Sequence, residues 1–412
     1  MYLNSGIKSE CFGCEACAQI CSVSAITMLE DDEGFNYPVI DNDKCIGCGQ
    51  CRKVCPYTYT PEYQKEEKYV FGGYHRNKYI RFDSTSGGAF SAIIDAFCDE
   101  NYVIFGAESQ RLKVFHSFIT DKKDLSKYRK SKYSQSKIGN SYKQVKNFLE
   151  AGKKVLFSGT PCQIAGLDNY LKKAQKNNLL TVEVVCEGVP SPLYIRKYNN
   201  YIKGKYSAEI EYLDYRFTGN SIFNNGKWDF QVMKTDLICN QNNKSLSLQK
   251  DRWFNPFWSV WLKHLMSRPS CYECPFARQE RVADITLGDL WGVHLYCPEV
   301  YGKNGGSSLI VCNSSKGKAV FQKAREKMYG HDLVFSDALK YQGPMRDHIA
   351  YNNDRDAFMY DLKSSMTYKE INNKWADKPS LKLLFSKYIW GNRQKIWLWN
   401  IRYSSKRLKQ ND

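Results

Sequence analysis

Eight cysteines near the N-terminus constrain the fold of this chain more than any other feature. They form two runs with one spacing: Cys11, Cys14, Cys17 and Cys21, then Cys45, Cys48, Cys51 and Cys55, with Pro56 directly after the second run. The spacing C-x2-C-x2-C-x3-C is typical of bacterial ferredoxin segments that hold two 4Fe-4S clusters. The last cysteine of each run reaches the other cluster, so the expected ligand sets are Cys11, Cys14, Cys17 and Cys55, and Cys45, Cys48, Cys51 and Cys21.

Zinc and disulfides are the alternatives for these cysteines, and the sequence disfavours both. Zinc sites pair C-x2-C knuckles across a long spacer, which differs from two identical four-cysteine runs. Disulfides require an oxidising compartment, and the residues before Cys11 contain no apolar run of the kind found in a signal peptide.

Composition sets the compartment and the kind of partner. The chain has 412 residues, enough for two or three domains, and a formal net charge of +17. It contains no apolar run of eighteen residues, so we expect no spanning helix. We expect a cytoplasmic protein, which suits oxygen-sensitive clusters and many free thiols. The basic charge suits an acidic electron-carrier protein, a phosphorylated ligand or an anionic membrane surface, whereas no nucleic-acid-binding module accompanies it.

The sequence predicts four regions: a two-cluster α+β domain at 1–60, the two parts of an α/β body with a mixed sheet at 61–150 and 151–345, and a helical tail at 346–412. Residues 57–68 are polar and read as a linker. Hydrophobic periodicity predicts alternating strands and helices in the body. Strands are expected at 69–74, 102–106, 114–119, 154–158, 180–186, 209–217, 228–234 and 309–312, and helices at 88–99, 141–151, 161–173, 256–266 and 316–328.

A third cysteine set lies in the body. Cys162 and Cys186 each follow a predicted strand, and Cys271 and Cys274 form a C-x2-C pair. Ligand sites of open α/β sheets lie at the carboxyl ends of strands, so a third four-thiolate site is plausible. Spacing alone leaves other interpretations open, because Cys162 and Cys186 could be core residues and the pair could be half of a zinc site.

Several body motifs resemble the coenzyme F420 hydrogenase/dehydrogenase beta subunit family. These are Ser86-Gly87-Gly88, the stretch 131–136, the strand and turn before Cys162, the four body cysteines, and the stretch 283–292. The resemblance spans roughly residues 70 to 310. It implies an iron–sulfur flavoprotein that uses FAD, and it assigns Cys162, Cys186, Cys271 and Cys274 to a third 4Fe-4S cluster close to the flavin.

Two positions depart from the family pattern. The family often has arginine and glycine before the Ser-Lys-Tyr stretch, where this chain has Arg129 and Lys130. The turn after Cys186 often carries histidine, where this chain has Glu187. Both positions lie near the inferred flavin region, so the substrate or acceptor can differ from that of better-known members.

The flavin contacts are expected at three places. Ser86, Gly87 and Gly88 stand at a predicted helix N-terminus, where backbone N–H groups can meet a pyrophosphate. The stretch Ser131, Lys132, Tyr133, Gln135 and Ser136 supplies polar donors and an aromatic ring. Gly159 and Thr160 would bring backbone close to the flavin. A tight turn and a polar surface loop are the alternatives, and no G-x-G-x-x-G fingerprint follows a strand.

The sequence thus predicts an oxidoreductase that passes single electrons from a ferredoxin-like donor through 4Fe-4S clusters to FAD for hydride transfer to an organic substrate, or the reverse. The alternative is a non-catalytic electron-transfer subunit of a larger redox complex. Asp289 and His294 are the candidate catalytic residues, and Asp284 is a further carboxylate at the same strand. The remaining cysteines, Cys98, Cys239, Cys297 and Cys312, read as core or surface thiols.

The end of the chain, from Pro379 onward, is basic and contains Trp390, Trp397 and Trp399. A helix of this composition can lie on an anionic membrane face, which would make the protein membrane-peripheral. The alternative, which we favour, is a helix that packs its aromatic residues on the body.

Overall fold

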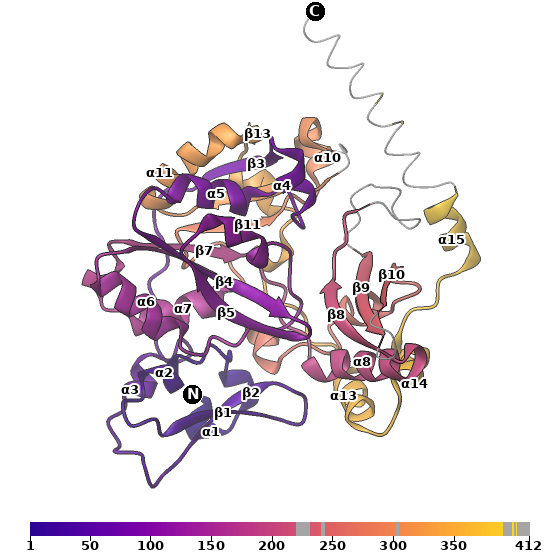
Figure 1. Ribbon diagram of the computed structural model, residues 1–412, viewed down its shortest axis with the longest axis horizontal. Coiled ribbons are helices and arrows are strands. Elements are labelled where there is room, and N and C mark those ends of the chain that lie inside the picture. Colours follow the sequence, from indigo (N-terminus) through magenta and orange to yellow (C-terminus); the bar gives the residue numbers. More distant parts are fainter. Residues whose placement is uncertain (220–230, 240–243, 302–304, 390–397, 399–400, 402–412) are drawn as a thin grey trace, which may run out of the picture.

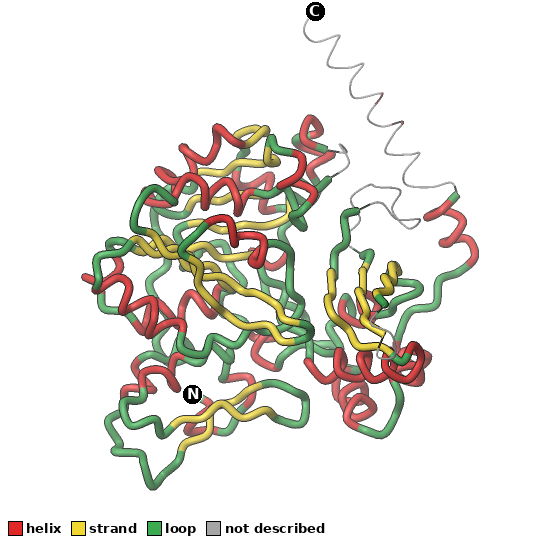
Figure 2. Tube along the Cα trace, in the orientation of Figure 1, coloured by secondary structure: helices red, strands yellow, loops and turns green. Residues whose placement is uncertain are grey.

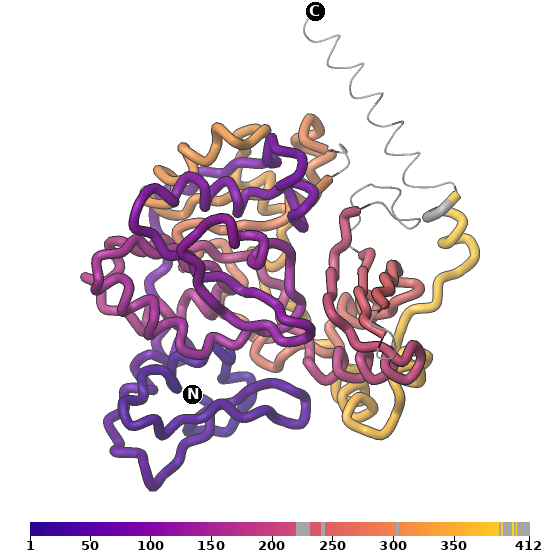
Figure 3. Tube along the Cα trace, viewed as in Figure 1, coloured from indigo at the N-terminus to yellow at the C-terminus, as the bar shows by residue number. Residues whose placement is uncertain are grey.

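The protein has three parts, seen in a computed structural model that describes residues 1–219, 231–239, 244–301, 305–389, 398 and 401 (Figure 1). The N-terminal domain lies below a large α/β body, and a smaller unit of three strands and several helices stands beside that body. The chain colours in Figure 3 show that the last helices return to this smaller unit, far from the strands that precede them in sequence.

The N-terminal domain is built from short elements around the cysteine loops. Helix α2 (Ala16–Ile20) and helix α3 (Gln50–Lys53) each follow one loop, and strands β1 (Ile26–Glu30) and β2 (Asn36–Ile40) pair as an antiparallel hairpin. Helix α1 (Tyr2–Ser5) precedes them. The 57–68 segment contains no helix or strand, as the sequence predicts, and its Gln64 N–H donates to the Arg281 carbonyl at 2.8 Å.

One mixed eight-stranded sheet forms the body (Figure 2). Its strand order is β13-β3-β12-β11-β7-β6-β4-β5. The four central strands, β11, β7, β6 and β4, are parallel, and the outer neighbours pair antiparallel. The strands are β3 (Tyr69–His75), β4 (Tyr102–Gln110), β5 (Lys113–Ile119), β6 (Lys154–Gly159), β7 (Leu179–Val184), β11 (Ile285–Asp289), β12 (Ser308–Cys312) and β13 (Met328–Asp332).

Helices cover both faces of this sheet. Leu156 of β6 packs in one hydrophobic core with α5 (Ala89–Phe97) and α11 (Ser315–Ala324). The neighbouring residues Val155 and Phe157 point the other way and pack with α6 (Ser141–Glu150) and α7 (Pro161–Tyr170). All three strand residues are fully buried, which explains the continuous apolar run that predicts a central parallel strand. Phe12, Cys14 and Val54 of the N-terminal domain join the second core, so that domain sits against α6 and α7.

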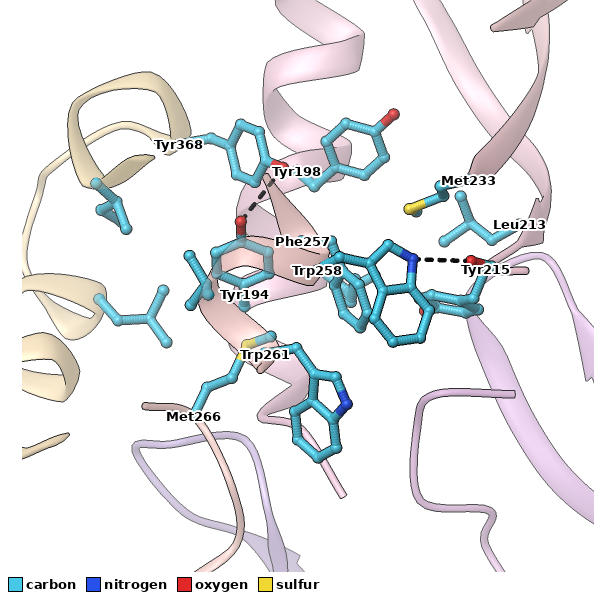
Figure 4. Close-up of a cluster of buried hydrophobic side chains, with 14 of the residues drawn as sticks. Tyr194, Tyr198, Leu213, Tyr215, Met233, Phe257, Trp258, Trp261, Met266 and Tyr368 are labelled. Atoms are coloured by element: carbon cyan, nitrogen blue, oxygen red, sulfur yellow. Dashed lines mark hydrogen bonds between the residues drawn. The ribbon is translucent and has the colours of Figure 1, made fainter. Parts of the chain in front are cut away.

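The smaller unit has its own aromatic core, drawn in Figure 4. Strands β8 (Ala208–Asp214), β9 (Met233–Cys239) and β10 (Ser245–Lys250) pair antiparallel beside helix α8 (Pro192–Tyr206). Helices α13 (Arg355–Lys363) and α14 (Tyr368–Trp375) pack on α8 and contribute Phe358 and Tyr368 to this core. In Figure 4 the Trp258 indole N–H donates to the Tyr215 carbonyl at 3.0 Å. The core thus joins residues from the second half of the predicted body with residues from the predicted tail.

Most predicted elements are confirmed, and three differ. The helix at 256–266 is shorter, α9 (Phe257–Trp261), because the chain continues as turns from Leu262 and has a left-handed residue, His264, with a φ of 55°. The helix at 316–328 ends at Ala324, and Met328 instead begins the edge strand β13 that pairs with β3. The strand at 228–234 begins only at Met233, and residues 228–230 lie outside the described residues.

The predicted basic tail is only partly described. Helix α15 (Leu381–Tyr388) is present, whereas Trp390, Trp397 and Trp399 lie outside the described residues. Within the described part of the chain, every helix is too short or too polar to cross a membrane.

Candidate functional site

The four body cysteines line one cavity, although they come from three separate stretches of the chain. Cys162 is in the first turn of α7, directly after β6, and Cys186 follows β7. Cys271 and Cys274 belong to the turn around the short helix at Pro269–Glu273. Because β6 and β7 are parallel neighbours, their carboxyl ends bring Cys162 and Cys186 to the same edge of the sheet. The cavity is partly open to solvent, and the space between its lining atoms, open solvent included, is about 600 Å³.

Local sequence fixes the position of Cys162. Thr160 caps α7 and Pro161 occupies its first turn, so the helix begins at the cavity wall. The Gln163 side chain accepts from the Thr160 N–H at 3.0 Å, and the Thr160 hydroxyl lies 3.2 Å from the Cys162 Sγ. The side chain of Thr160 therefore contacts the thiol at the start of the helix that it caps.

Burial raises the pKa of all four cavity thiols, and neighbouring cysteines add to the shift at Cys186, Cys271 and Cys274. Burial raises the pKa of Cys271 to about 12 and that of Cys274 to about 11, each with a further contribution from neighbouring cysteines. Burial also raises the pKa of Cys162 and Cys186. Uncoordinated thiols here would hold their protons at neutral pH, so loading an iron–sulfur group releases protons.

The set does not suit a single metal ion. Among the residues that the structure describes, no three His, Cys, Asp or Glu side chains stand together as ligands of one ion. Zinc draws its sulfur ligands to about 2.3 Å from one centre. The four thiols of the cavity match the all-sulfur donor chemistry of an iron–sulfur cluster.

The N-terminal domain docks directly against this cavity. Phe12, the neighbour of Cys11, lines the cavity wall, and the Gln135 side chain donates to the Phe12 carbonyl at 2.7 Å. Helix α7 approaches the first cysteine loop so closely that a Cβ on Gly166 would lie 3.0 Å from the Cys14 Sγ. The first cysteine loop and the four-thiol cavity are therefore adjacent.

The N-terminal cysteines divide into an inner and an outer group. Burial raises the pKa of Cys11, Cys14 and Cys17, and Cys55 adds to each of these shifts. Burial, together with Cys48 and Cys45, raises the pKa of Cys51. Cys45 and Cys48 are exposed. The inner group thus faces the body and the outer group faces solvent, while the pairing of Cys21 with the outer group stays a prediction.

The predicted flavin residues form a connected strip toward the cavity. The Ser131 N–H donates to Thr85 at 2.9 Å, which brings the 131–136 stretch beside the turn at Ser86-Gly87-Gly88. Tyr133 packs edge-on against Trp258, with ring centroids 4.9 Å apart, and burial raises its pKa to about 12. Gln135, at the other end of the strip, lines the cysteine cavity.

Many polar groups of the strip are already bonded within the chain. The Ser86 hydroxyl donates to the Ser307 carbonyl at 2.8 Å, and the Gly87 N–H donates to Ser308 at 2.9 Å. The Lys132 ammonium donates to the carbonyls of Lys127 and Arg129, and burial lowers its pKa to about 7. Gly88 has a φ of 83° at the start of α5, a conformation that favours glycine.

Ser136 belongs to a buried chain of hydrogen bonds next to Gly159. The Gln163 amide donates to the Ser136 hydroxyl at 3.0 Å, and this hydroxyl lies 2.9 Å from His116 Nδ1. His116 Nε2 lies 2.8 Å from the Ser158 carbonyl, which can only accept, so Nε2 carries the proton and Nδ1 accepts from Ser136. Gly159 follows Ser158 at the end of β6.

The candidate catalytic residues lie at different places. Asp289 forms an ion pair with the buried Arg216 at 2.7 Å, and Arg216 also bonds Tyr133. His294 is in the short helix α10 (Val293–Tyr296), and its ring centroid lies 5.3 Å from that of Tyr301 with the two planes tilted by 49°. Burial lowers the pKa of His294. Asp284 accepts hydrogen bonds from Thr181 and Ser314 and therefore joins β7 to β11 and α11. Of these three residues, Asp289 is the one linked to the strip, through Arg216 and Tyr133.

The two departures from the family pattern have structural explanations. Lys130 has a φ of 66°, in the left-handed region, at the position where the family often has glycine. Its ammonium binds Asp214 at 2.6 Å and ties the strip to β8. Glu187 lies 3.9 Å from His264 on the cavity wall, and burial raises its pKa against the opposing effect of Arg216.

Sequence reasoning missed two buried arginines in the cavity wall, Arg268 and Arg281. Arg281 pairs with the buried Glu183. Arg268 donates to the Cys11 carbonyl at 2.8 Å and thereby joins the two cysteine regions. The only sequence signal for Arg268 is its place three residues before the Cys271 pair, which is weak by itself.

A ferredoxin-type domain docked beside a cysteine-lined cavity on an α/β body defines an iron–sulfur electron-transfer protein. Residues 10–59 match a 4Fe-4S dicluster domain, and a second description of such a domain matches residues 37–85. Residues 152–331 match the family described as the C terminus of the beta subunit of Coenzyme F420 hydrogenase/dehydrogenase. The body of the chain is thus similar to this beta subunit family over residues 152–331, and residues 10–59 to a dicluster domain, as the sequence motifs predict.

Solved structures add a distant resemblance. One match is a chain of a xenon-derivatised F420-reducing NiFe hydrogenase complex from Methanosarcina barkeri, with 14% sequence identity and a TM-score of 0.39. The alignment covers 64% of this chain and 82% of that chain. A comparison with curated proteins finds no match.

Proposed function

We propose that this protein relays single electrons through three 4Fe-4S clusters between a ferredoxin-like redox protein and FAD on the α/β body. The electrons would serve the two-electron (hydride) reduction of an organic substrate, or the flow would run in reverse. The observation that carries this proposal is the adjacency of the inner cysteines to the four-thiol cavity: Phe12 lines the cavity beside Cys11.

In this proposal the thiols form three ligand sets, ordered from solvent to the body. Cys45, Cys48, Cys51 and Cys21 would hold the outer cluster, at the exposed end of the domain. Cys11, Cys14, Cys17 and Cys55 would hold the inner cluster, against α7. Cys162, Cys186, Cys271 and Cys274 would hold the third. The order from solvent to body follows from the exposure of Cys45 and Cys48 and the burial of Cys14.

FAD, when bound, supplies the conversion between one-electron and two-electron chemistry. The residues proposed to hold it are Ser86, Gly87, Gly88, Ser131, Lys132, Tyr133, Gln135, Ser136, Gly159 and Thr160. The Thr85 bond to Ser131 and the position of Gln135 in the cavity wall make this strip continuous. Asp289 would hold Arg216 and, through it, Tyr133 in place. His294 is the candidate for proton transfer. The family description suggests a deazaflavin such as coenzyme F420 as one substrate class.

Iron quantitation tests the third cluster. Three cubanes carry about twelve irons per chain, at four irons each. We expect Cys162→Ala to lose about four irons and to keep both N-terminal clusters. The matched control is Cys312→Ala, because Cys312 is buried in β12 away from the cavity lining and should leave the iron content unchanged. Equal iron in both variants would exclude a cluster at the cavity.

A second candidate is a non-catalytic electron-transfer subunit of a larger complex. The observation that favours it is that Ser86, Gly87, Gln135 and Ser136 already bond within the chain. Flavin quantitation and turnover of the isolated chain, with and without the products of neighbouring genes, separate the two. Activity that appears only with a partner supports the subunit, whereas bound FAD that bleaches with a low-potential donor supports the enzyme.

A further inference from the structure

Arg268 stands between the inner cysteine loop and the four-thiol cavity. Its side chain is fully buried, with 0% exposed. Nε donates to the Cys11 carbonyl at 2.8 Å, and Nη2 lies 3.5 Å from the Cys11 Sγ. Nη2 also donates to the Asn36 carbonyl, and Nη1 donates to the Gln135 side chain at 3.0 Å. The same residue lines the cavity that holds the other four thiols.

The chain holds this guanidinium in one position. The central carbon of the guanidinium, Cζ, lies 4.3 Å from the centre of the Tyr37 ring, within the range of a cation–π contact. The partners come from both domains, since Cys11, Asn36 and Tyr37 belong to the N-terminal domain and Gln135 belongs to the body. These contacts hold the Arg268 guanidinium beside the Cys11 Sγ and in the wall of the four-thiol cavity.

No carboxylate balances this charge among the residues that the structure describes: no Asp or Glu oxygen lies within ion-pair distance of Arg268. Arg281, in the wall of the same cavity, differs because it pairs with Glu183. A buried charge without a counterion costs several kcal/mol. The anions that face Arg268 are the cysteine sulfurs, once they are thiolates of a cluster.

We propose that Arg268 is a positioning residue shared by two clusters, whose positive charge raises the reduction potentials of the inner N-terminal cluster and of the third cluster. This inference rests on the three-cluster relay proposed above. Adding an electron to a cluster adds negative charge, and a nearby cation stabilises the reduced form. One electron would pass between the inner and the third cluster, oxidising the donor cluster and reducing the acceptor cluster in either direction of the relay, and no covalent bond would form or break. Because Arg268 contacts the Cys11 Sγ, we expect its charge to raise the reduction potential of the inner cluster more than that of the third cluster.

The test is a redox titration of the full chain, followed by electron paramagnetic resonance, with iron content measured on each sample. We expect Arg268→Gln to shift the inner cluster to lower potential, the third cluster by less, and the outer cluster not at all. Arg268→Lys keeps the charge and should keep potentials close to those of the wild type. Lys8→Gln is the matched control, because Lys8 is 39% exposed and pairs with Asp31 and Asp32, so its loss should shift nothing.

Each outcome decides the proposal. Loaded Arg268→Gln with unchanged potentials overturns it, and so does an equal shift in Arg268→Lys and Arg268→Gln. If Arg268→Lys binds its clusters and Arg268→Gln does not, cluster binding requires the positive charge rather than the hydrogen bonds of the guanidinium. That result supports the proposal. If neither variant binds its clusters, Arg268 has only a structural role, and the proposed effect on the reduction potentials is wrong. If wild-type protein contains only two clusters, the three-cluster relay under Proposed function is wrong, whatever the role of Arg268.

Discussion

At the scale of single residues, buried polar groups of this protein are held in defined protonation states. The hydrogen-bond chain from Gln163 through Ser136 to His116 ends on the Ser158 carbonyl and keeps His116 neutral. Burial lowers the pKa of His116 to about 4, because an imidazolium in this position would be desolvated. This chain lies directly beneath the turn that leads to Cys162.

This state predicts a pH dependence of stability. The unfolded chain binds a proton on His116 near pH 6.5, whereas the folded chain binds it only near pH 4, so the free energy of unfolding falls as the pH falls through that window. Between pH 7 and pH 5 the loss amounts to about 2 kcal/mol. We expect His116→Gln to flatten this dependence, measured by urea unfolding of anaerobic protein.

The control for this measurement is His331→Gln, since His331 is exposed on β13 and its replacement should leave the slope unchanged. An identical slope in wild type and His116→Gln would mean that His116 is charged in the folded protein.

Residue types with a fixed chemistry were the most predictable part of the site. The spacing of the cysteines predicts the dicluster domain, and the four body cysteines do line one cavity. Arg268 and Arg281 could not be found in this way, because their roles depend on contacts between segments that are far apart in sequence. The same reason applies to Ser136, since sequence alone does not reveal that Gln163 and His116 already bond its hydroxyl.

At the scale of elements, the β1–β2 hairpin attaches the N-terminal domain to the rest of the chain. Glu33, in the turn of this hairpin, forms a buried ion pair with Arg355 of α13, with Oε2 and Nη2 2.6 Å apart. Ser191, at the start of α8, donates to the Glu33 carbonyl at 2.5 Å. The hairpin tip is therefore fixed to the smaller unit, while the cysteine loops are fixed to α7.

We expect Glu33→Gln to lower the free energy of unfolding by about 3 kcal/mol, because it leaves the Arg355 charge buried without its carboxylate. Glu30→Gln removes the neighbouring ion pair to Arg196, whose side chains are 47% and 43% exposed, and should cost less than about 1 kcal/mol. Urea unfolding and limited proteolysis in the 57–68 linker measure both. Equal costs in the two variants would contradict a rigidly attached domain.

Element prediction succeeded where one element buries a continuous apolar run. Strand β6, with three fully buried residues in succession, and helix α7, with its Thr160 and Pro161 start, were both predicted. The end of α11 was not, because Met328 becomes a strand residue only through its pairing with His75 of β3, more than two hundred residues earlier. Local sequence determines whether a segment tends to form a helix or a strand, whereas pairing with distant segments determines the residue at which that helix or strand ends.

At the scale of the whole molecule, the two ends of the proposed relay differ in exposure and charge. The outer cysteines Cys45 and Cys48 are exposed, and Ile46 between them is 65% exposed. Arg52 and Lys53 lie exposed on α3 beside this loop. With a net charge of +17, the molecule would attract an acidic carrier, and Arg52 and Lys53 are the cations that we expect to meet it beside the outer cysteines.

We expect the double variant Arg52→Glu, Lys53→Glu to slow reduction by an acidic ferredoxin roughly tenfold at low ionic strength, with a smaller effect at high salt. Stopped-flow measurement of cluster bleaching gives the rate. Lys323→Glu is the control, because Lys323 is exposed on α11, which covers the opposite face of the sheet from the N-terminal domain. A loss of rate in the control as large as in the double variant would mean that overall charge, and not this surface, attracts the carrier.

The three separate origins of the cavity thiols also set an order of biosynthesis. A ribosome completes all eight N-terminal cysteines before it makes Cys162, and more than a hundred further residues separate Cys162 from Cys274. A cluster carrier can therefore serve the two cysteine runs while the body is still being translated, whereas the cavity exists only after the turn at Pro269–Glu273 has packed onto the strand ends. Under iron limitation, newly made chains would thus fill the N-terminal sites first and leave the cavity for last.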